Sequence, residues 1–312
     1  MNGTDNSRLA QAAGCLGAAL YRAIEPYFSK LEKTAQEIRL RVNRPAAVVC
    51  RGKTWYLTRG GSLTDLPCGD LLTVSRSQLD EVFARLCDYS VYAHRREIAH
   101  GYITLRGGHR AGICGTAVAS DGRVTNVRDI SSVNLRIARE HRGCAEAVFR
   151  AVDNGGMLLC GPPCSGKTTV LRDLARLLSQ SDGQNVSLID ERGELAACCR
   201  GEPQNDVGLC DVFDGYPKAA AMEQALRAMA PATILCDEIG GEEDAAAVAQ
   251  CVNSGVRLIA TAHAADEREL YGRAALRQVL ATGAFSTLVF LKGRERAGQI
   301  ATVVRAGESR AA

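Results

Sequence analysis

Residues 157–170 read MLLCGPPCSGKTTV, and this stretch decides the fold. Its first four residues are apolar and predict a buried strand, while the residues after Lys167 predict a helix. Between them, Gly161 to Thr168 match the phosphate-loop pattern G-x-x-x-x-G-K-[ST]. A preceding strand and a following helix separate a genuine match from a Gly-Pro turn that happens to precede a lysine. The stretch therefore predicts an α/β nucleotide-binding domain.

Each type of residue in this loop has a physical role. Gly161 and Gly166 allow backbone conformations that a side chain would block, so successive N–H groups turn toward a triphosphate. The helix N-terminus adds partial positive charge. Lys167 is expected to reach the β- and γ-phosphates of ATP, and the Thr168 hydroxyl to bind Mg²⁺. The residues expected to bind the nucleotide are Gly161, Pro162, Pro163, Cys164, Ser165, Gly166, Lys167, Thr168 and Thr169.

Three further apolar runs end in polar or charged residues. Because helical segments alternate with these runs, the sequence predicts a parallel sheet covered by helices on both faces. Ligands of such sheets bind at the carboxyl ends of the strands. The runs, with the residues that follow them, are 186–189 before Asp190-Glu191-Arg192, 233–236 before Asp237-Glu238, and 256–260 before Thr261-Ala262-His263-Ala264.

The acidic strand ends predict the chemistry of a nucleotide hydrolase. Asp237 is expected to hold Mg²⁺ through its water shell, and Glu238 to polarise the attacking water. Glu191 is a competing candidate for the general base, although the pattern favours Glu238. His263 is expected near the γ-phosphate, where it would sense the nucleotide, with a structural histidine as the alternative.

The two halves of the 312-residue chain differ in charge. Residues 1–150 carry 22 Lys and Arg against 14 Asp and Glu, a net charge of +8, which leaves −5 for residues 151–312. We expect an N-terminal α/β domain over 1–150 and the nucleotide-binding domain over 151–312. A basic half indicates either a polyanionic partner or contact with the acidic face of a neighbouring subunit.

Secondary structure is expected in both halves. In the first, the periodicity predicts a helix over 7–33, three strands and a hairpin around the glycine-rich residues 101–115. In the second, residues 201–217 are rich in Gly, Pro, Asp and Asn and predict a loop. The last residues, from Thr287 onward, predict a terminal hairpin.

Composition indicates a globular protein of the cytosol. Hydrophobic residues make up 46% of the chain, and no apolar run approaches the ~20 residues that cross a bilayer. The chain does not open like a secretory signal, so we expect membrane contact only through partners. The 13 cysteines are scattered and include no C-x-x-C pair, which predicts free thiols.

An arginine-rich run lies near the expected domain boundary. Between Arg123 and Arg142 the chain has five arginines, with Asp129 and Glu140 as the acidic residues. Arginine forms planar, two-pronged hydrogen bonds with phosphate. This run is therefore a candidate for reaching the nucleotide of a neighbouring subunit.

Taken in order, these motifs resemble the stage III sporulation protein AA family, over about residues 36–305. Many proteins contain a phosphate loop, but few contain this series. The motifs are Gly161–Thr168, Asp190-Glu191-Arg192, Pro203-Gln204-Asn205-Asp206-Val207-Gly208, Pro217-Lys218-Ala219, Cys236-Asp237-Glu238-Ile239-Gly240 and Thr261-Ala262-His263-Ala264, preceded by Glu37–Pro45 and Ser131–Glu140.

The family is similar to the type II and type IV secretion ATPases. The resemblance implies a RecA-like motor behind the N-terminal domain, usually assembled as a homo-hexamer. It implies action on the mother-cell side of the channel to the forespore, with integral-membrane partners. Glu238 then matches the Walker B glutamate, His263 the histidine box and Asp190-Glu191 the acidic box. Cys164 and Gly193 depart from the expected pattern.

The resemblance also implies arginine fingers supplied by the N-terminal domain. The positions expected for them are Arg110, Arg123 and Arg136.

Two other functions stay open from the residues alone. A nucleic-acid motor would suit the basic half, but the arginine run lacks the interleaved aromatic residues on which single strands stack, so no nucleic-acid partner is expected. A nucleotide switch that scaffolds partners without hydrolysis would need the phosphate loop but no general base.

Overall fold

The computed structural model describes residues 7–181 and 185–305, and the chain divides into two compact units between Arg139 and Glu140. The sequence analysis placed this boundary after residue 150, and the observed boundary lies earlier in the chain. Helix α6 (Glu146–Phe149) explains the difference, because Ala145 and Val148 are buried in the core of the second unit. Each unit has its own sheet and is described separately.

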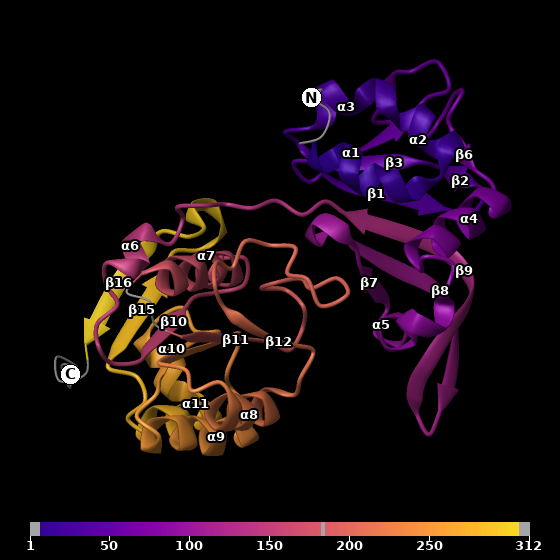
Figure 1. Ribbon diagram of the computed structural model, residues 1–312. Coiled ribbons are helices and arrows are strands. Elements are labelled where there is room, and N and C mark those ends of the chain that lie inside the picture. Colours follow the sequence, from indigo (N-terminus) through magenta and orange to yellow (C-terminus); the bar gives the residue numbers. More distant parts are fainter. Residues whose placement is uncertain (1–6, 182–184, 306–312) are drawn as a thin grey trace. The chain divides into compact units, whose positions relative to one another are not determined.

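The N-terminal unit contains a seven-stranded antiparallel sheet in the order β5-β4-β3-β1-β9-β8-β7 (Figure 1). A two-stranded ladder joins β2 to β6. The expected strands and hairpin are confirmed. The strands are β1 (Ala35–Arg41), β2 (Arg44–Pro45), β3 (Ala47–Cys50), β4 (Lys53–Leu57), β5 (Leu63–Thr64), β6 (Thr73–Val74), β7 (Tyr102–Thr104), β8 (Arg110–Ser120) and β9 (Arg123–Arg136).

The helix expected over 7–33 is wrong as a single element. Gly17 has a φ of 79°, which ends one helical stretch, and Pro26 begins a new short turn. The pieces still present one apolar face, and their leucines and Ile24 are buried against the sheet. The helices of this unit are α1 (Arg8–Ala13), α2 (Ala18–Ile24), α3 (Phe28–Leu31), α4 (Arg76–Leu86) and α5 (Arg95–Ala99).

Residues 123–136 of the arginine-rich run form strand β9, which the sequence analysis did not identify as a strand. Val133 and Leu135 alternate with less buried residues, and together with Ile130 they are buried against the helices. The outer half of the strand pairs with β8 in a hairpin that extends past the rest of the sheet (Figure 1). The outer half of β9 has no buried residue, and Asp129 has a positive φ of 50° in the middle of the strand. The run therefore shows no continuous period of two.

His109 is buried between this sheet and α1. The ring is fully covered, with Nδ1 accepting the N–H of Ala138 (3.0 Å) and Nε2 lying 3.3 Å from Gln11 Oε1. Burial, assisted by the positive charge of Arg8, lowers the pKa of His109 from its usual 6.5 to about 4. The folded unit therefore holds this histidine in its neutral form.

Acid is expected to destabilise the N-terminal unit through His109. Since the pKa is lower in the folded state, stability is full above pH 6.5 and is lost as the pH falls toward 4. At pH 5 the loss from this group is about 2 kcal/mol. Urea unfolding at pH 7 and pH 5, followed by the fluorescence of Trp55 in β4, measures it. A His109→Gln variant should lose less stability over this interval, and equal losses would assign the effect to other groups.

The C-terminal unit is a seven-stranded sheet in the order β12-β11-β13-β14-β10-β15-β16. All neighbouring pairs are parallel except β15 with β16, which form the expected terminal hairpin. The strands are β10 (Met157–Cys160), β11 (Val186–Asp190), β12 (Asp211–Asp214), β13 (Thr233–Cys236), β14 (Arg257–Ala262), β15 (Thr287–Leu291) and β16 (Ile300–Arg305). Residues 201–217 were predicted to form a loop, and this is wrong for residues 211–214, which form β12, a short edge strand.

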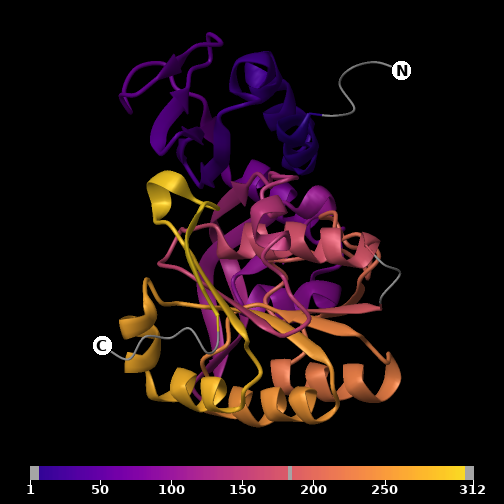
Figure 2. The ribbon, with the colours of Figure 1, turned by 90° about the vertical axis from the view of Figure 1, so that its left-hand side faces the viewer.

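Helices cover both faces of this sheet, as predicted (Figures 1 and 2). One apolar core lies under α8, α9, α10 and α11, and a second lies under α6 and α7. These helices are α7 (Lys167–Gln180), α8 (Lys218–Ala228), α9 (Glu242–Asn253), α10 (Glu267–Gly272) and α11 (Ala274–Ala281). Among the described residues, no helix is both long and apolar enough to cross a membrane.

Candidate nucleotide-binding site

The predicted site residues meet at one edge of the C-terminal sheet. Strands β10, β14 and β13 are neighbours, and their carboxyl ends deliver the phosphate loop, Thr261 and Asp237 to the same place. These residues line a single open pocket, which we call the triphosphate pocket. Its lining is Cys164, Ser165, Gly166, Lys167, Thr168, Thr169, Arg192, Glu194, Asp237, Glu238, Thr261 and His263.

The phosphate loop adopts a conformation that requires its second glycine. Gly166 has a φ of 89°, and a Cβ there would lie 3.0 Å from the backbone nitrogen of Gly298. Gly298 donates to Ser165 O (2.8 Å), so the turn between β15 and β16 supports the loop. Cys164, one of the departures from the expected pattern, is exposed and also has a positive φ of 61°. The loop thus holds a non-glycine residue in the left-handed region.

Lys167 connects the loop to the neighbouring strands. Its ammonium donates to Gly161 O (2.7 Å), Pro162 O (3.1 Å) and His263 Nδ1 (3.1 Å). Burial lowers the pKa of Lys167 below its usual value, while the carboxylates of Glu238 and Asp237 act in the opposite direction. The carboxylates are therefore near enough to interact with the lysine that is expected to bind phosphate.

The hydrogen bonds of His263 determine which ring nitrogen carries the proton. An ammonium can only donate, so Nδ1 accepts from Lys167 and the proton of the neutral ring lies on Nε2. Nε2 lies 3.4 Å from Glu238 Oε1. His263 therefore bridges the phosphate loop and Glu238, and its sensing role stays a prediction.

Asp237 is held by two hydrogen bonds at the end of β13. Its Oδ1 accepts from Thr261 Oγ1 (2.9 Å) and from the N–H of Glu238 (3.0 Å). Both of these bonds go to Oδ1, so Oδ2 is the oxygen that could bind a metal. The Thr168 hydroxyl lines the same pocket. A carboxylate and a hydroxyl are hard oxygen ligands, so this pair fits Mg²⁺.

Neighbouring side chains hold both the carboxylate and the backbone of Glu238. Its Oε2 accepts from Arg192 NH1 (3.1 Å), and its Oε1 faces His263. Its backbone carbonyl accepts from the ammonium of Lys218, and its N–H also donates to Thr261 Oγ1 (3.0 Å). Lys218, at the start of α8, and Thr261 were not among the expected site residues, although both belong to the motifs that carry the family resemblance.

The expected acidic pair does not join this group. Asp190 is 1% exposed, and its carboxylate accepts from the backbone N–H groups of residues 194–197. It therefore organises the loop after β11. Glu191 is exposed, 3.9 Å from Lys218, and is not part of the lining of the triphosphate pocket. The geometry accordingly favours Glu238 over Glu191 as the base.

The three arginines expected to act as fingers lie in the N-terminal unit. Arg110 and Arg136 are cross-strand partners in β8 and β9. The Arg110 guanidinium lies 4.1 Å from the ring centre of Tyr102, and Arg136 is 3.9 Å from Glu37. Arg123 is exposed at the tip of the hairpin. A role for any of them at a nucleotide stays a prediction.

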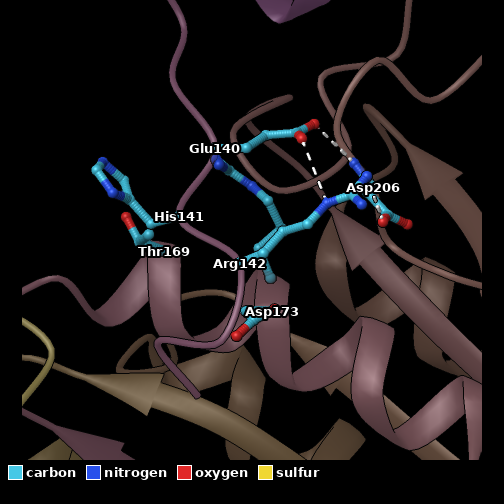
Figure 3. A pocket seen from close by; sticks show the side chains of 7 residues that line it. Glu140, His141, Arg142, Thr169, Asp173 and Asp206 are labelled. Carbon is cyan, nitrogen blue, oxygen red and sulfur yellow. Dashed lines mark hydrogen bonds and ion pairs between the residues drawn. The ribbon is translucent and has the colours of Figure 1, made fainter. Parts of the chain in front are cut away.

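A second, smaller pocket lies where the chain enters the C-terminal unit (Figure 3). Arg142 forms an ion pair with Asp206 (2.9 Å), whose N–H donates to Glu140 Oε1 (3.1 Å). On α7, Asp173 accepts the N–H of Ala145 (2.9 Å). Residues 140–145 are thereby fixed to α7 through Asp173 and to the loop after β11 through Asp206.

Comparison with known proteins identifies the family. Residues 7–310 match the family described as sporulation stage III, protein AA. Stage III sporulation protein AA of Bacillus subtilis (strain 168) is 35% identical over 276 residues, which are 86% of each chain. The chain belongs to the stage III sporulation protein AA family. The resemblance inferred from the motifs is thus confirmed.

Two solved structures share the fold of this family member. The Legionella pneumophila ATPase DotB superposes with a TM-score of 0.54 at 15% identity, covering 85% of this chain and 75% of DotB. The pilus retraction motor PilT with bound ADP gives 0.57 at 19% identity, covering 87% and 76%. This confirms the predicted RecA-like P-loop fold for the stage III sporulation protein AA chain.

Proposed function

We propose that this protein is a Mg²⁺-dependent ATPase of the secretion-motor type. The observation that carries the proposal is the triphosphate pocket, which brings Lys167, Thr168, Asp237 and Glu238 together at the carboxyl ends of parallel strands. The ADP bound to PilT, a protein of similar fold, supports a nucleotide as the ligand. A switch without hydrolysis would not need Glu238 beside the phosphate loop.

In the proposed mechanism the loop and Lys167 bind the β- and γ-phosphates of ATP. Thr168 and Asp237 would hold Mg²⁺, which when bound would neutralise charge on the phosphates. Asp237 is already oriented for this by Thr261. Glu238 orients the attacking water and accepts its proton, and His263 Nε2 donates toward the same region.

We also propose that the motor works as a homo-oligomer, with a hexamer expected from the family resemblance. One of Arg110, Arg123 and Arg136 would then reach a neighbour's γ-phosphate, where an arginine raises the rate by roughly 10³ to 10⁵. The proposed location is cytoplasmic, with membrane association through integral-membrane channel proteins between mother cell and forespore. A nucleic-acid partner is not part of this proposal.

Steady-state hydrolysis by the purified chain tests the function. We expect Mg-ATP turnover that EDTA abolishes, with a specific activity that rises with protein concentration as subunits associate. Mass in solution, measured with and without nucleotide over the same concentrations, provides the matching structural readout. A chain that binds ATP but never releases phosphate at any concentration would instead be a nucleotide switch.

A further inference from the structure

Both carboxylate oxygens of Glu238 already have partners in this structure. Oε2 accepts from Arg192 NH1 at 3.1 Å, and Oε1 lies 3.4 Å from His263 Nε2. A carboxylate has about four lone-pair sites, so water can still approach Glu238, but the positive guanidinium at Oε2 opposes the transfer of a proton to that carboxylate. Glu238 therefore accepts a proton more readily once Arg192 moves away.

Arg192 is the partner that is placed to leave. Its side chain is 63% exposed, and it lines the triphosphate pocket with Lys167 and Asp237. An ion pair between two partly exposed side chains is a weak interaction, because water screens the charges. The ion pair itself therefore does little to hold the guanidinium at Glu238.

Hydrogen bonds hold the backbone of the loop that follows Arg192, so the side chain can move without the loop. The buried carboxylate of Asp190 accepts four backbone N–H groups of the loop that follows. From α7, Arg172 donates to Leu195 O (2.8 Å) and Glu194 O (2.6 Å). A side chain that rotates on such a loop keeps its reach into the pocket without any rearrangement of the sheet.

We propose that Arg192 exchanges Glu238 for the γ-phosphate when ATP binds. The guanidinium would then hold the terminal phosphate from within the same subunit, and the freed Glu238 would accept the proton of the attacking water. The nucleotide thereby switches on its own base, and ADP, which lacks the γ-phosphate, leaves the Arg192–Glu238 pair intact. This role depends on the ATPase function proposed above.

Binding of ATP and ADP to an Arg192→Ala variant tests the contact, with no need for turnover. A hydrogen bond between charged groups corresponds to about a ten- to hundredfold change in affinity. We expect ATP affinity to fall by about tenfold or more, while ADP affinity stays within about twofold. Arg192→Lys, which keeps the charge without the planar fork, should recover part of the loss. Arg227→Ala is the matched control, since Arg227 pairs with Glu223 on the exposed surface of α8.

A double-mutant cycle with Glu238→Gln tests the exchange itself. Without the carboxylate, ATP binding no longer has to break an ion pair, so Glu238→Gln alone should tighten ATP more than ADP. Removing Arg192 in that background should cancel the gain. If Arg192→Ala weakens ATP and ADP equally, or leaves both affinities unchanged, the exchange is wrong. If the wild-type chain binds neither nucleotide, the ATPase proposal fails first.

Discussion

ATP turnover is expected to fall by about 10² to 10³-fold when Lys167 is replaced by alanine, as for loss of a principal donor to a developing phosphate charge. The Lys167 side chain is buried at the bottom of the triphosphate pocket, where low exposure to water strengthens its attraction to phosphate. Unlike the other changes considered, this one should also weaken binding of both ATP and ADP. Phosphate release and nucleotide titration of Lys167→Ala measure the two effects.

The control for Lys167→Ala must separate charge from position. Lys292 lies in the same unit, outside the triphosphate pocket, with its ammonium 3.4 Å from Gln299 Oε1. Lys292→Ala removes the same charge and should leave turnover within about twofold, since surface changes seldom matter more. A thermal unfolding midpoint for each variant shows whether the protein is folded. Full turnover by a folded Lys167→Ala protein would refute the proposal that the triphosphate pocket hydrolyses ATP.

The fold of the C-terminal unit was predictable because its signals are local. An apolar strand, a glycine-rich loop and a helix follow one another between Met157 and Gln180, and β11, β13 and β14 each repeat the pattern of a buried run before a polar residue. Strand β12 lacked that pattern. It has four residues, begins and ends with aspartate, and becomes a strand only by pairing with β11.

The site was predictable in its residue types and less so in its pairings. The roles of Lys167 and Glu238 follow from a motif, whereas the partners of Asp190 are backbone N–H groups, which every residue except proline carries. No sequence pattern distinguishes a carboxylate that binds such groups from one that faces a ligand. The contact between Arg192 and Glu238 joins residues 46 positions apart and likewise needed the sheet order to be known.

Replacing Glu238 with glutamine is expected to abolish most hydrolysis, while ATP binds at least as tightly as it does to the wild-type chain. General-base catalysis contributes about 10² to 10⁴-fold to a rate, and glutamine keeps the size of the side chain but cannot accept the proton. Lys167 and the loop, which hold the phosphates, do not depend on the charge of Glu238. Single-turnover phosphate release measures the chemical step, and retention of labelled ATP measures binding.

Glu191→Gln distinguishes the two carboxylates that the sequence left in competition. Glu191 is exposed and 3.9 Å from Lys218, so its loss should change turnover by no more than about twofold. The reverse result, with Glu191→Gln inactive and Glu238→Gln active, would make Glu191 the base and would require its loop to move into the pocket. Because Asp190 fixes that loop through four backbone hydrogen bonds, we expect Glu238 alone to be required.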